Sequence, residues 1–419
     1  MGYRVEVFDK NLKRVGEIDE WISLDFTVRL CQEGAWQILI KDGTPQSQLI
    51  EKGGGVAIWQ DGVSKPILSG QVDTFQKYWT KLQHTGPGSL YIAGKCHNTL
   101  AYRRLAFPDP TKAVDKQYQS RLYTRPLRYL YAPEAIWDEF NTAFGPGALA
   151  DRRVSWVNLG TRPTNPLGPN VPTPWGLGDS LRFDNIGSKV EEWYDKRNFA
   201  YRFLYNGTTQ KVDLEIFAPR DKSKEVRFSP ELGNLREYIW TLSAPKVTRA
   251  IVGAAGEKRD RYYYQKVDSA SESEWGLQIE QFIDRRDIPL KVDVNTGAVV
   301  KAETDMTTDD FDTAKQAVQE AATDALTEGE KSGNFQIYPI DTPDCAFGKH
   351  YFVGDKVTVA VDGTEYTDIV REVVISVDDG GNVQDISPKI GQQGTGDPLN
   401  LYKTVYDMQK KLRKLEARM

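Results

Sequence analysis

Cysteine and histidine are scarce in this sequence, and long apolar runs are missing. Its 419 residues include three cysteines and three histidines, and no run approaches the roughly 18 apolar residues that a membrane-spanning helix requires. Cys31, Cys96 and Cys345 are an odd, scattered set, so we expect free thiols and no disulfide framework. The first residues are charged and lack the apolar core of a signal peptide, so we expect synthesis in a reducing cytoplasm.

Sequence signatures of catalysis and cofactor binding are missing as well. The histidines stand apart, and neither an HExxH nor a CxxC motif occurs, which leaves a zinc site without a basis. Gly88–Cys96 has one residue too many for a phosphate-binding loop, and Asp293–Gly297 places its glycine one position too early for a calcium loop. We therefore predict no catalytic residue, no metal site and no cofactor.

The composition favours a folded, β-rich protein of more than one domain. Hydrophobic residues make up 39%, and the 10 Trp and 20 Tyr supply large side chains for packed cores. The 35 Gly and 21 Pro predict many turns, and the length suggests roughly two to four domains. The net charge of −5 argues against a protein that grips nucleic acid by its phosphates.

Apolar residues alternate with polar ones in many short segments, which predicts half-buried strands. The alternating segments are 3–7, 22–30, 36–40, 212–216, 357–361 and 373–377. Turn dipeptides that favour antiparallel hairpins occur between such runs, at Asp61-Gly62, Asn206-Gly207, Asp362-Gly363 and Asp379-Gly380. Trp36, Trp137 and Trp193 occupy alternating or helical positions, so we expect them in cores rather than on a sugar-binding surface.

Three helices are predicted between the β segments. Pro133 suits the first turn of a helix from residue 132, and a second helix starts near Asn185. For the third, Thr307 and Asp310 fit a capping box and Gly329 fits the end, and its small, Ala-rich face suits close packing against a core.

Two segments are candidates for contacts with other proteins. Five prolines between Thr161 and Gly178 exclude a helix or a central strand. We interpret this segment, which includes Trp175, as an exposed extended loop; the alternative is an arm that wraps a neighbouring subunit. After the Gly-rich stretch Gly391–Gly396, apolar residues repeat with heptad spacing, which favours a self-associating coiled coil over a helix docked on its own chain. These residues, which we call the heptad seam, are Leu401, Val405, Met408, Leu412, Leu415 and Met419.

Several segments resemble a known family. The opening Tyr3–Trp21, YRVEVFDKNLKRVGEIDEW, followed by AWQILI, is similar to the start of actinobacteriophage siphovirus minor tail proteins of the tail-hub type. The likeness continues, in consistent order, in LAFPDP (105–110), FIDRRD (282–287), VGDKVTV (353–359), VREVVISV (370–377) and PKIG (388–391).

The resemblance implies a mainly β fold with α+β insertions, two tail-tube-like β-barrels per chain and a C-terminal coiled-coil helix. Residues 1–98 would form the first barrel, 99–244 an outer α+β domain that includes the Pro-rich loop 161–178, 245–391 a second barrel interrupted by an insertion at 259–331, and 392–419 a hinge and the heptad helix.

The function implied by the resemblance is structural. The protein would be a homotrimeric tail-tip or baseplate hub of the virion, assembled in the host cytoplasm, that connects the tail tube to the host-contacting tip. Its partners would be tail-tube proteins, tip or fibre proteins, and DNA that passes through the channel without specific binding; no membrane segment is expected. Two alternatives stay open: a tail-associated hydrolase of cell-wall polysaccharide or peptide, and a receptor-binding module that uses Trp175.

Overall fold

The computed structural model describes residues 2–79, 88–120, 125–129, 131–168, 177–302, 306–340, 342 and 344–391. The chain divides into two compact units: unit 1 consists of Met1–Ile239 and Phe335–Gly391, and unit 2 contains Trp240–Asn334. Among the described residues, none of the helices combines the length and the apolar character needed to span a bilayer.

The N-terminal strands of unit 1 follow the alternating pattern of the sequence. They are β1 (Tyr3–Phe8), β2 (Arg14–Ile18), β3 (Ser23–Arg29), β4 (Ala35–Lys41), β5 (Gly55–Gln60), β6 (Leu68–Tyr78) and β7 (Ser89–Cys96), with a short 3-10 helix at Ser47–Leu49. Neighbouring strands pair antiparallel in the order β3-β4-β7-β6-β5-β1-β2. The alternation predicted for residues 22–30 is confirmed within β3, where Leu24 and Phe26 are buried, but Ile22, just before the strand, is exposed.

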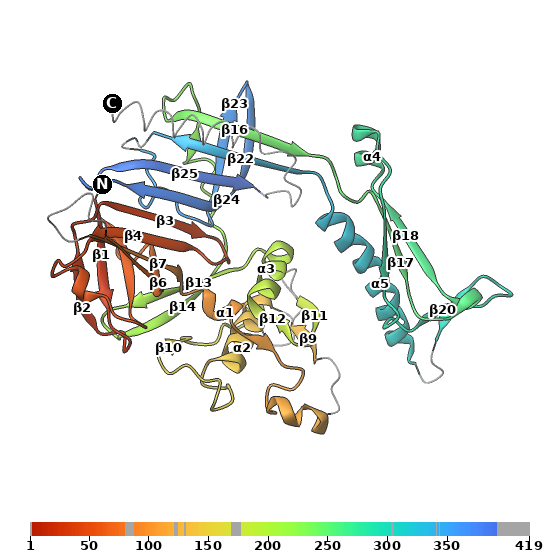
Figure 1. Cartoon of the computed structure of the whole chain (residues 1–419). Helices are drawn as coiled ribbons and strands as arrows, with labels where there is room; N and C mark the ends of the chain where they lie inside the picture. The colour runs from red at the N-terminus through yellow and green to blue at the C-terminus, as the bar shows by residue number, and fades with distance from the viewer. Residues whose placement is uncertain are drawn as a thin grey trace. The chain divides into compact units, whose positions relative to one another are not determined.

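The C-terminal strands continue the same sheet. They are β15 (Arg227–Phe228), β16 (Leu235–Ser243), β22 (Ser332–Pro339), β23 (Lys356–Val361), β24 (Thr364–Val377) and β25 (Val383–Gly391). The predicted hairpin at Asp362-Gly363 is confirmed: it joins β23 to β24, and both residues adopt the positive φ angles of a two-residue turn. β24 also pairs with β3, so the described strands form one 13-stranded sheet (Figure 1).

The expected pair of separate barrels is therefore not what the structure contains. Among the described strands no barrel closes, and residues 1–98 share both a sheet and a hydrophobic core with residues 356–391. In that core, Phe26 of β3 lies opposite Ile375 of β24. The physical reason is the free edge of β3, whose backbone groups need a partner on the side away from β4 and find it in β24.

Residues 99–217 build the α+β part of unit 1, and the predicted helices at 132 and 185 are confirmed. The elements are α1 (Thr99–Tyr102), β8 (Leu105–Ala106), a 3-10 helix (Val114–Gln119), β9 (Arg125–Tyr129), α2 (Ala132–Ala143), β10 (Val157–Asn158), β11 (Leu177–Leu181), β12 (Asp184–Asn185), α3 (Ile186–Arg197), β13 (Ala200–Asn206) and β14 (Lys211–Phe217). Asn185 caps α3 by accepting the backbone N–H of Ser188.

A second core joins these helices to the N-terminal strands. Phe140 of α2 and Trp193 of α3 are buried with Phe203 of β13, as expected for a core tryptophan. β5 is buried on both faces, because Val56 faces the core of the large sheet while Ala57 faces the α+β part. Figure 1 shows α1, α2 and α3 grouped together beside β13 and β14.

Unit 2 is a small sheet covered by one long helix. Its remaining elements are β17 (Arg249–Gly253), a 3-10 helix (Lys258–Asp260), β18 (Tyr263–Val267), α4 (Ser269–Trp275), β19 (Glu280–Asp284), β20 (Leu290–Val292), β21 (Val299–Lys301) and α5 (Thr308–Glu328). The predicted capping box of Thr307 and Asp310 is confirmed.

The boundary of the predicted insertion is corrected by this unit. Residues 245–258 were expected in the second barrel, but β17 pairs with β18 and β19 instead. The reason is packing: Ala250 and Val252 of β17 lie against the small residues of α5, where Ala322 is fully buried. The Ala-rich face of the helix thus requires β17 as its partner, and the compact unit begins at Trp240 rather than at residue 259.

Candidate functional site

The two contact segments expected from the sequence lie mainly outside the described residues. The heptad seam, from Leu401 to Met419, is beyond Gly391, where the description ends. Of the Pro-rich loop, residues 169–176 with Trp175 are likewise outside it.

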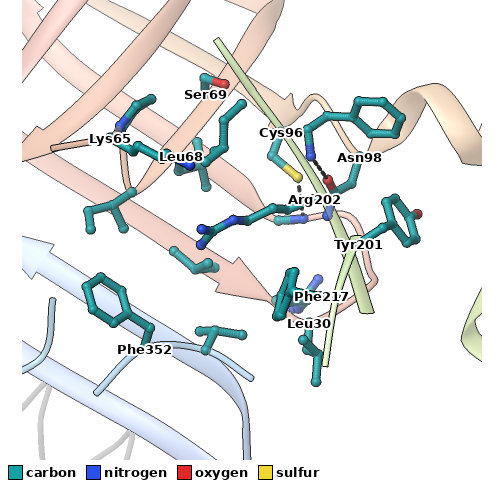
Figure 2. A pocket seen from close by; sticks show the side chains of 18 of the residues that line it. Leu30, Lys65, Leu68, Ser69, Cys96, Asn98, Tyr201, Arg202, Phe217 and Phe352 are labelled. Atoms are coloured by element: carbon teal, nitrogen blue, oxygen red, sulfur yellow. Dashed lines mark hydrogen bonds between the residues drawn. The ribbon is translucent and has the colours of Figure 1, made fainter. Parts of the chain in front are cut away.

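Unit 1 contains a cavity of about 380 Å³ between segments that are far apart in the sequence. Its walls come from the end of β3, the loop 63–67 before β6, the middle of β13, residues 217–220 and residues 347–355. Figure 2 shows Lys65 and Leu68 on one side of this space and Phe352 on another, with Arg202 between them. The volume is within the range of about 300–1,000 Å³ that small-molecule sites commonly have.

Strand alternation places Arg202 in this cavity. Tyr201 and Phe203, its neighbours on β13, pack into the second core, so the side chain between them points the other way. Arg202 lies directly opposite Glu215 of β14 in the hairpin register, and its Nε donates to the Glu215 carboxylate over 2.6 Å. The guanidinium also stacks on Phe217, 5.3 Å from the ring centroid.

Glu215 is shared between two cations, because Lys65 donates to its other carboxylate oxygen. Burial alone would raise the pKa of Glu215, but the hydrogen bond from Lys65 and the charge of Arg202 outweigh it and hold the pKa below its ordinary value. This carboxylate is therefore ionised at neutral pH, and it balances only one of the two cations.

The other two cations of the cavity, Arg220 and Arg29, also pair with carboxylates. Arg220 forms a bidentate pair with Asp355, with N–O distances of 2.7 and 2.6 Å, and its hydrogen bonds to Asp355 raise the pKa of Arg220. The Nε of Arg29 donates to Glu372 over 2.5 Å. Asp355 thus neutralises Arg220, whereas Glu372 is shared between Arg29 and Lys389.

Groups that could act as nucleophiles or bases in this region are held in unreactive forms. Cys96 lines the cavity, and burial raises the pKa of its thiol to about 11; burial raises the pKa of Cys31 to about 12. His97 packs between Phe8 and Trp156, and burial lowers its pKa to about 3. The three cysteines are free, as predicted, and the described residues contain no cluster of side chains suited to hold a metal ion. The cavity offers charged side chains and apolar surface.

Sequence reasoning missed this site because no spacing motif marks it. The alternation of 212–216 placed Glu215 on the polar face of its strand, and the Asn206-Gly207 turn indicated a hairpin. The four-residue connection between β13 and β14 sets the register that brings Arg202 opposite Glu215. The approach of the loop 63–67 and of Phe352 depends on distant strand pairing, for which the sequence has no local sign.

Exposed aromatic residues mark candidate contact surfaces in each unit. In unit 1, β5 pairs with β6 only as far as Gln71, and beyond it the side chains of Tyr78 and Trp79 are 58% and 63% exposed. In unit 2, Tyr263 and Phe282 are more than half exposed on the sheet face opposite α5, and the guanidinium of Arg261 lies 5.5 Å from both rings. Large exposed apolar groups of this kind commonly mark interaction surfaces.

Comparison with solved structures shows that this fold occurs in phage tail proteins. The 43 kDa tail protein of prophage MuSo2 from Shewanella oneidensis aligns with a TM-score of 0.52 at 12% identity, over 93% of this chain and 97% of that one. A tail protein from Neisseria meningitidis MC58 aligns with a TM-score of 0.52 at 11% identity, over 94% and 98% of the two chains. At these identities the likeness shows a shared fold.

Sequence comparison identifies the family. No curated protein sequence matches this chain. Residues 4–392, which include nearly all of the described residues, match the family described as Siphovirus ReqiPepy6 Gp37-like protein. The chain belongs to this siphovirus protein family.

Proposed function

We propose that this protein is a structural component of the phage virion: a homotrimeric hub at the tail tip that joins the tail tube to the host-contacting tip. The observation that supports this most is the shared fold over 93% of this chain and 97% of the tail protein from Shewanella oneidensis, since so complete an overlap involves both units and not an isolated module. Membership of a siphovirus family agrees with it.

The large sheet of unit 1 suits a ring. Each chain has two groups of strands, β1–β7 and the C-terminal group β15, β16 and β22–β25. Three chains would present six such groups to a sixfold tail tube. In this proposal the two groups act as two tube-facing modules although they form one continuous sheet. Beyond Gln71, β6 has no partner strand on the β5 side among the described residues, and Tyr78 and the following Trp79 are exposed. This part of β6 would pair or pack against a neighbouring subunit.

The channel of such a ring would let DNA pass without specific binding. The net charge of −5 is compatible with this, because phosphates are repelled by an acidic wall. Tail-tube proteins on one side and tip or fibre proteins on the other would be the partners, and the role would be structural rather than enzymatic. Release of sugars or peptides from host cell wall by the purified protein would instead favour the hydrolase.

We further propose that the heptad seam holds the three C-terminal helices together. Leu412→Asp places a charge at a core position of the coiled coil, which burial strongly disfavours. We expect this variant to lose trimers in sedimentation and to reduce infectivity. Lys410→Asp, at the heptad position that faces away from the seam, serves as a control. Normal assembly and infectivity of Leu412→Asp would show that the helix is not an oligomerisation element.

Location in the particle tests the proposed function. Gold-labelled antibodies raised against unit 2, Trp240–Asn334, should bind intact phage particles at the tail end distal to the capsid. Labelling of the capsid would contradict a tail-tip hub. The proposal would also be contradicted if the particles were not labelled and this chain were missing from their proteins.

A further inference from the structure

The cavity in unit 1 has one cation that its surroundings do not fully satisfy. Only the Nε of Arg202 has a hydrogen-bond partner among the described residues, and its two terminal nitrogens donate to none of them. Its side chain is 39% exposed, and Figure 2 shows the guanidinium extending into the middle of the cavity. Four N–H groups at these nitrogens are therefore available to an acceptor inside this space.

Charge around the cavity points to an anionic acceptor. Four cations, Arg29, Lys65, Arg202 and Arg220, line its wall. Three carboxylates pair with them: Asp355 pairs with Arg220, and Glu215 is divided between Lys65 and Arg202. The third, Glu372, is shared by Arg29 and by Lys389, a fifth cation outside the cavity wall. The cations therefore outnumber the carboxylates, which favours a ligand with a negative charge, and a planar carboxylate matches the two terminal nitrogens of a guanidinium.

Apolar side chains form a large part of the remaining lining, beside a few polar ones such as Ser64 and Asn98. Leu68, Phe217 and Phe352 border the space around Arg202, and the rings of Phe217 and Phe352 each also lie beneath a guanidinium, of Arg202 and Arg220 respectively. A ligand that only paired with the Arg202 guanidinium would leave this apolar surface exposed to water. A ligand with an apolar body as well as an acid group would cover it.

We propose that this cavity binds an amphiphilic carboxylate, with its acid group on the terminal nitrogens of Arg202 and its apolar body against Leu68, Phe217 and Phe352. This chemistry occurs in a free aliphatic acid and in the C-terminal carboxylate of a protein chain that ends in apolar residues. The proposal goes beyond the hub function, because a tube-joining role needs no such site.

Two pairs of probes test the proposal by calorimetric titration of the full-length protein. Octanoate is compared with octan-1-ol, which has the same chain without the charge. The peptide acetyl-Ala-Leu-Phe with a free carboxylate is compared with its amide. We expect at least one acid to bind about ten-fold or more tightly than its neutral counterpart, and the pair in which this occurs identifies the source of the carboxylate.

Three variants connect the binding to the cavity. Arg202→Gln should reduce affinity for the acid about ten-fold and bring it to the level of the neutral probe, while Glu215 keeps Lys65 as its partner. Ala218→Trp adds bulk at an exposed position of the cavity wall and should weaken both acid and neutral probes. Arg227 is an exposed arginine of the same unit that does not line the cavity, so Arg227→Gln should leave the affinity for all four probes unchanged.

Thermal unfolding of each variant confirms that it is folded before it is titrated. The proposal is overturned if none of the four probes binds at millimolar concentration, if the neutral probes bind as tightly as the acids, or if Arg202→Gln and Ala218→Trp bind like the wild type. Because the hub function makes no claim about this cavity, each of these results would leave it standing.

Discussion

Substitution of Ile375 by alanine tests whether the N-terminal strands depend on the C-terminal ones. Ile375 lies on β24, is fully buried, and faces Phe26 on β3 and Ile386 on β25. The change removes three carbon atoms, a loss of about 2.5 kcal/mol in transfer free energy at ~0.8 kcal/mol each. The cavity that remains adds to this, so we expect the free energy of unfolding to fall by about 3–4 kcal/mol.

Hydrogen exchange identifies the strands in which the free energy of unfolding decreases. The buried residues Ile38 of β4 and Ile92 of β7 are cross-strand partners, and their strands lie second and third from β24 in the sheet order. If β1–β7 and β23–β25 unfold together, protection of these amides should fall by the same 3–4 kcal/mol as protection in β24. As a control, Thr364→Ala, at an exposed position of the same strand, should lower the free energy of unfolding by less than about 0.5 kcal/mol. Unchanged protection at Ile38 and Ile92 in Ile375→Ala would show that residues 1–98 fold on their own and would refute the single-sheet account.

Three further predictions concern buried polar groups. The pKa of His97 is about 3 in the folded protein, against 6.5 in the unfolded chain. Between these pH values only the unfolded state binds a proton at this residue, so the free energy of unfolding should decrease as the pH falls from 6.5 to about 3. In urea titrations at several pH values, His97→Gln should make the free energy of unfolding less dependent on pH. Glu139 is 1% exposed and forms a bidentate ion pair with Arg125. Arg125→Met leaves the Glu139 carboxylate buried without its partner, so the free energy of unfolding should fall by about 3–5 kcal/mol in the same assay. A loss below about 1 kcal/mol would show that the pair is not buried in solution. The three buried cysteines should react with a disulfide reagent only slowly in the native protein and rapidly in denaturant; fast native reaction would contradict their burial.

Local structure could be predicted from the sequence because its causes are local. The two-residue turn at Asp362-Gly363 needs positive φ angles, and the capping box at Thr307 satisfies backbone groups within one turn of helix. Each of these depends on residues only a few positions apart, so the printed order of residues contains the whole signal.

Long-range pairing could not be predicted in the same way. The strand 22–30 was recognisable by its alternation, but the identity of its second partner, β24, depends on which free edges meet in space. The same holds for β17, whose alternation suits either a barrel strand or the partner of α5. The cavity depends on both kinds of structure. Arg202 lies opposite Glu215 because of the local β13–β14 hairpin, whereas the contact of Lys65 with Glu215 depends on long-range folding.

The native mass of the purified protein tests the central proposal most directly. A hub that matches a sixfold tube with two strand groups per chain requires three copies of the 47.4 kDa chain. Native mass spectrometry at micromolar concentration should therefore give three times the mass of one chain, and deletion of residues 397–419 should reduce that population. A stable monomer whose mass is unaffected by the deletion would contradict the trimeric hub.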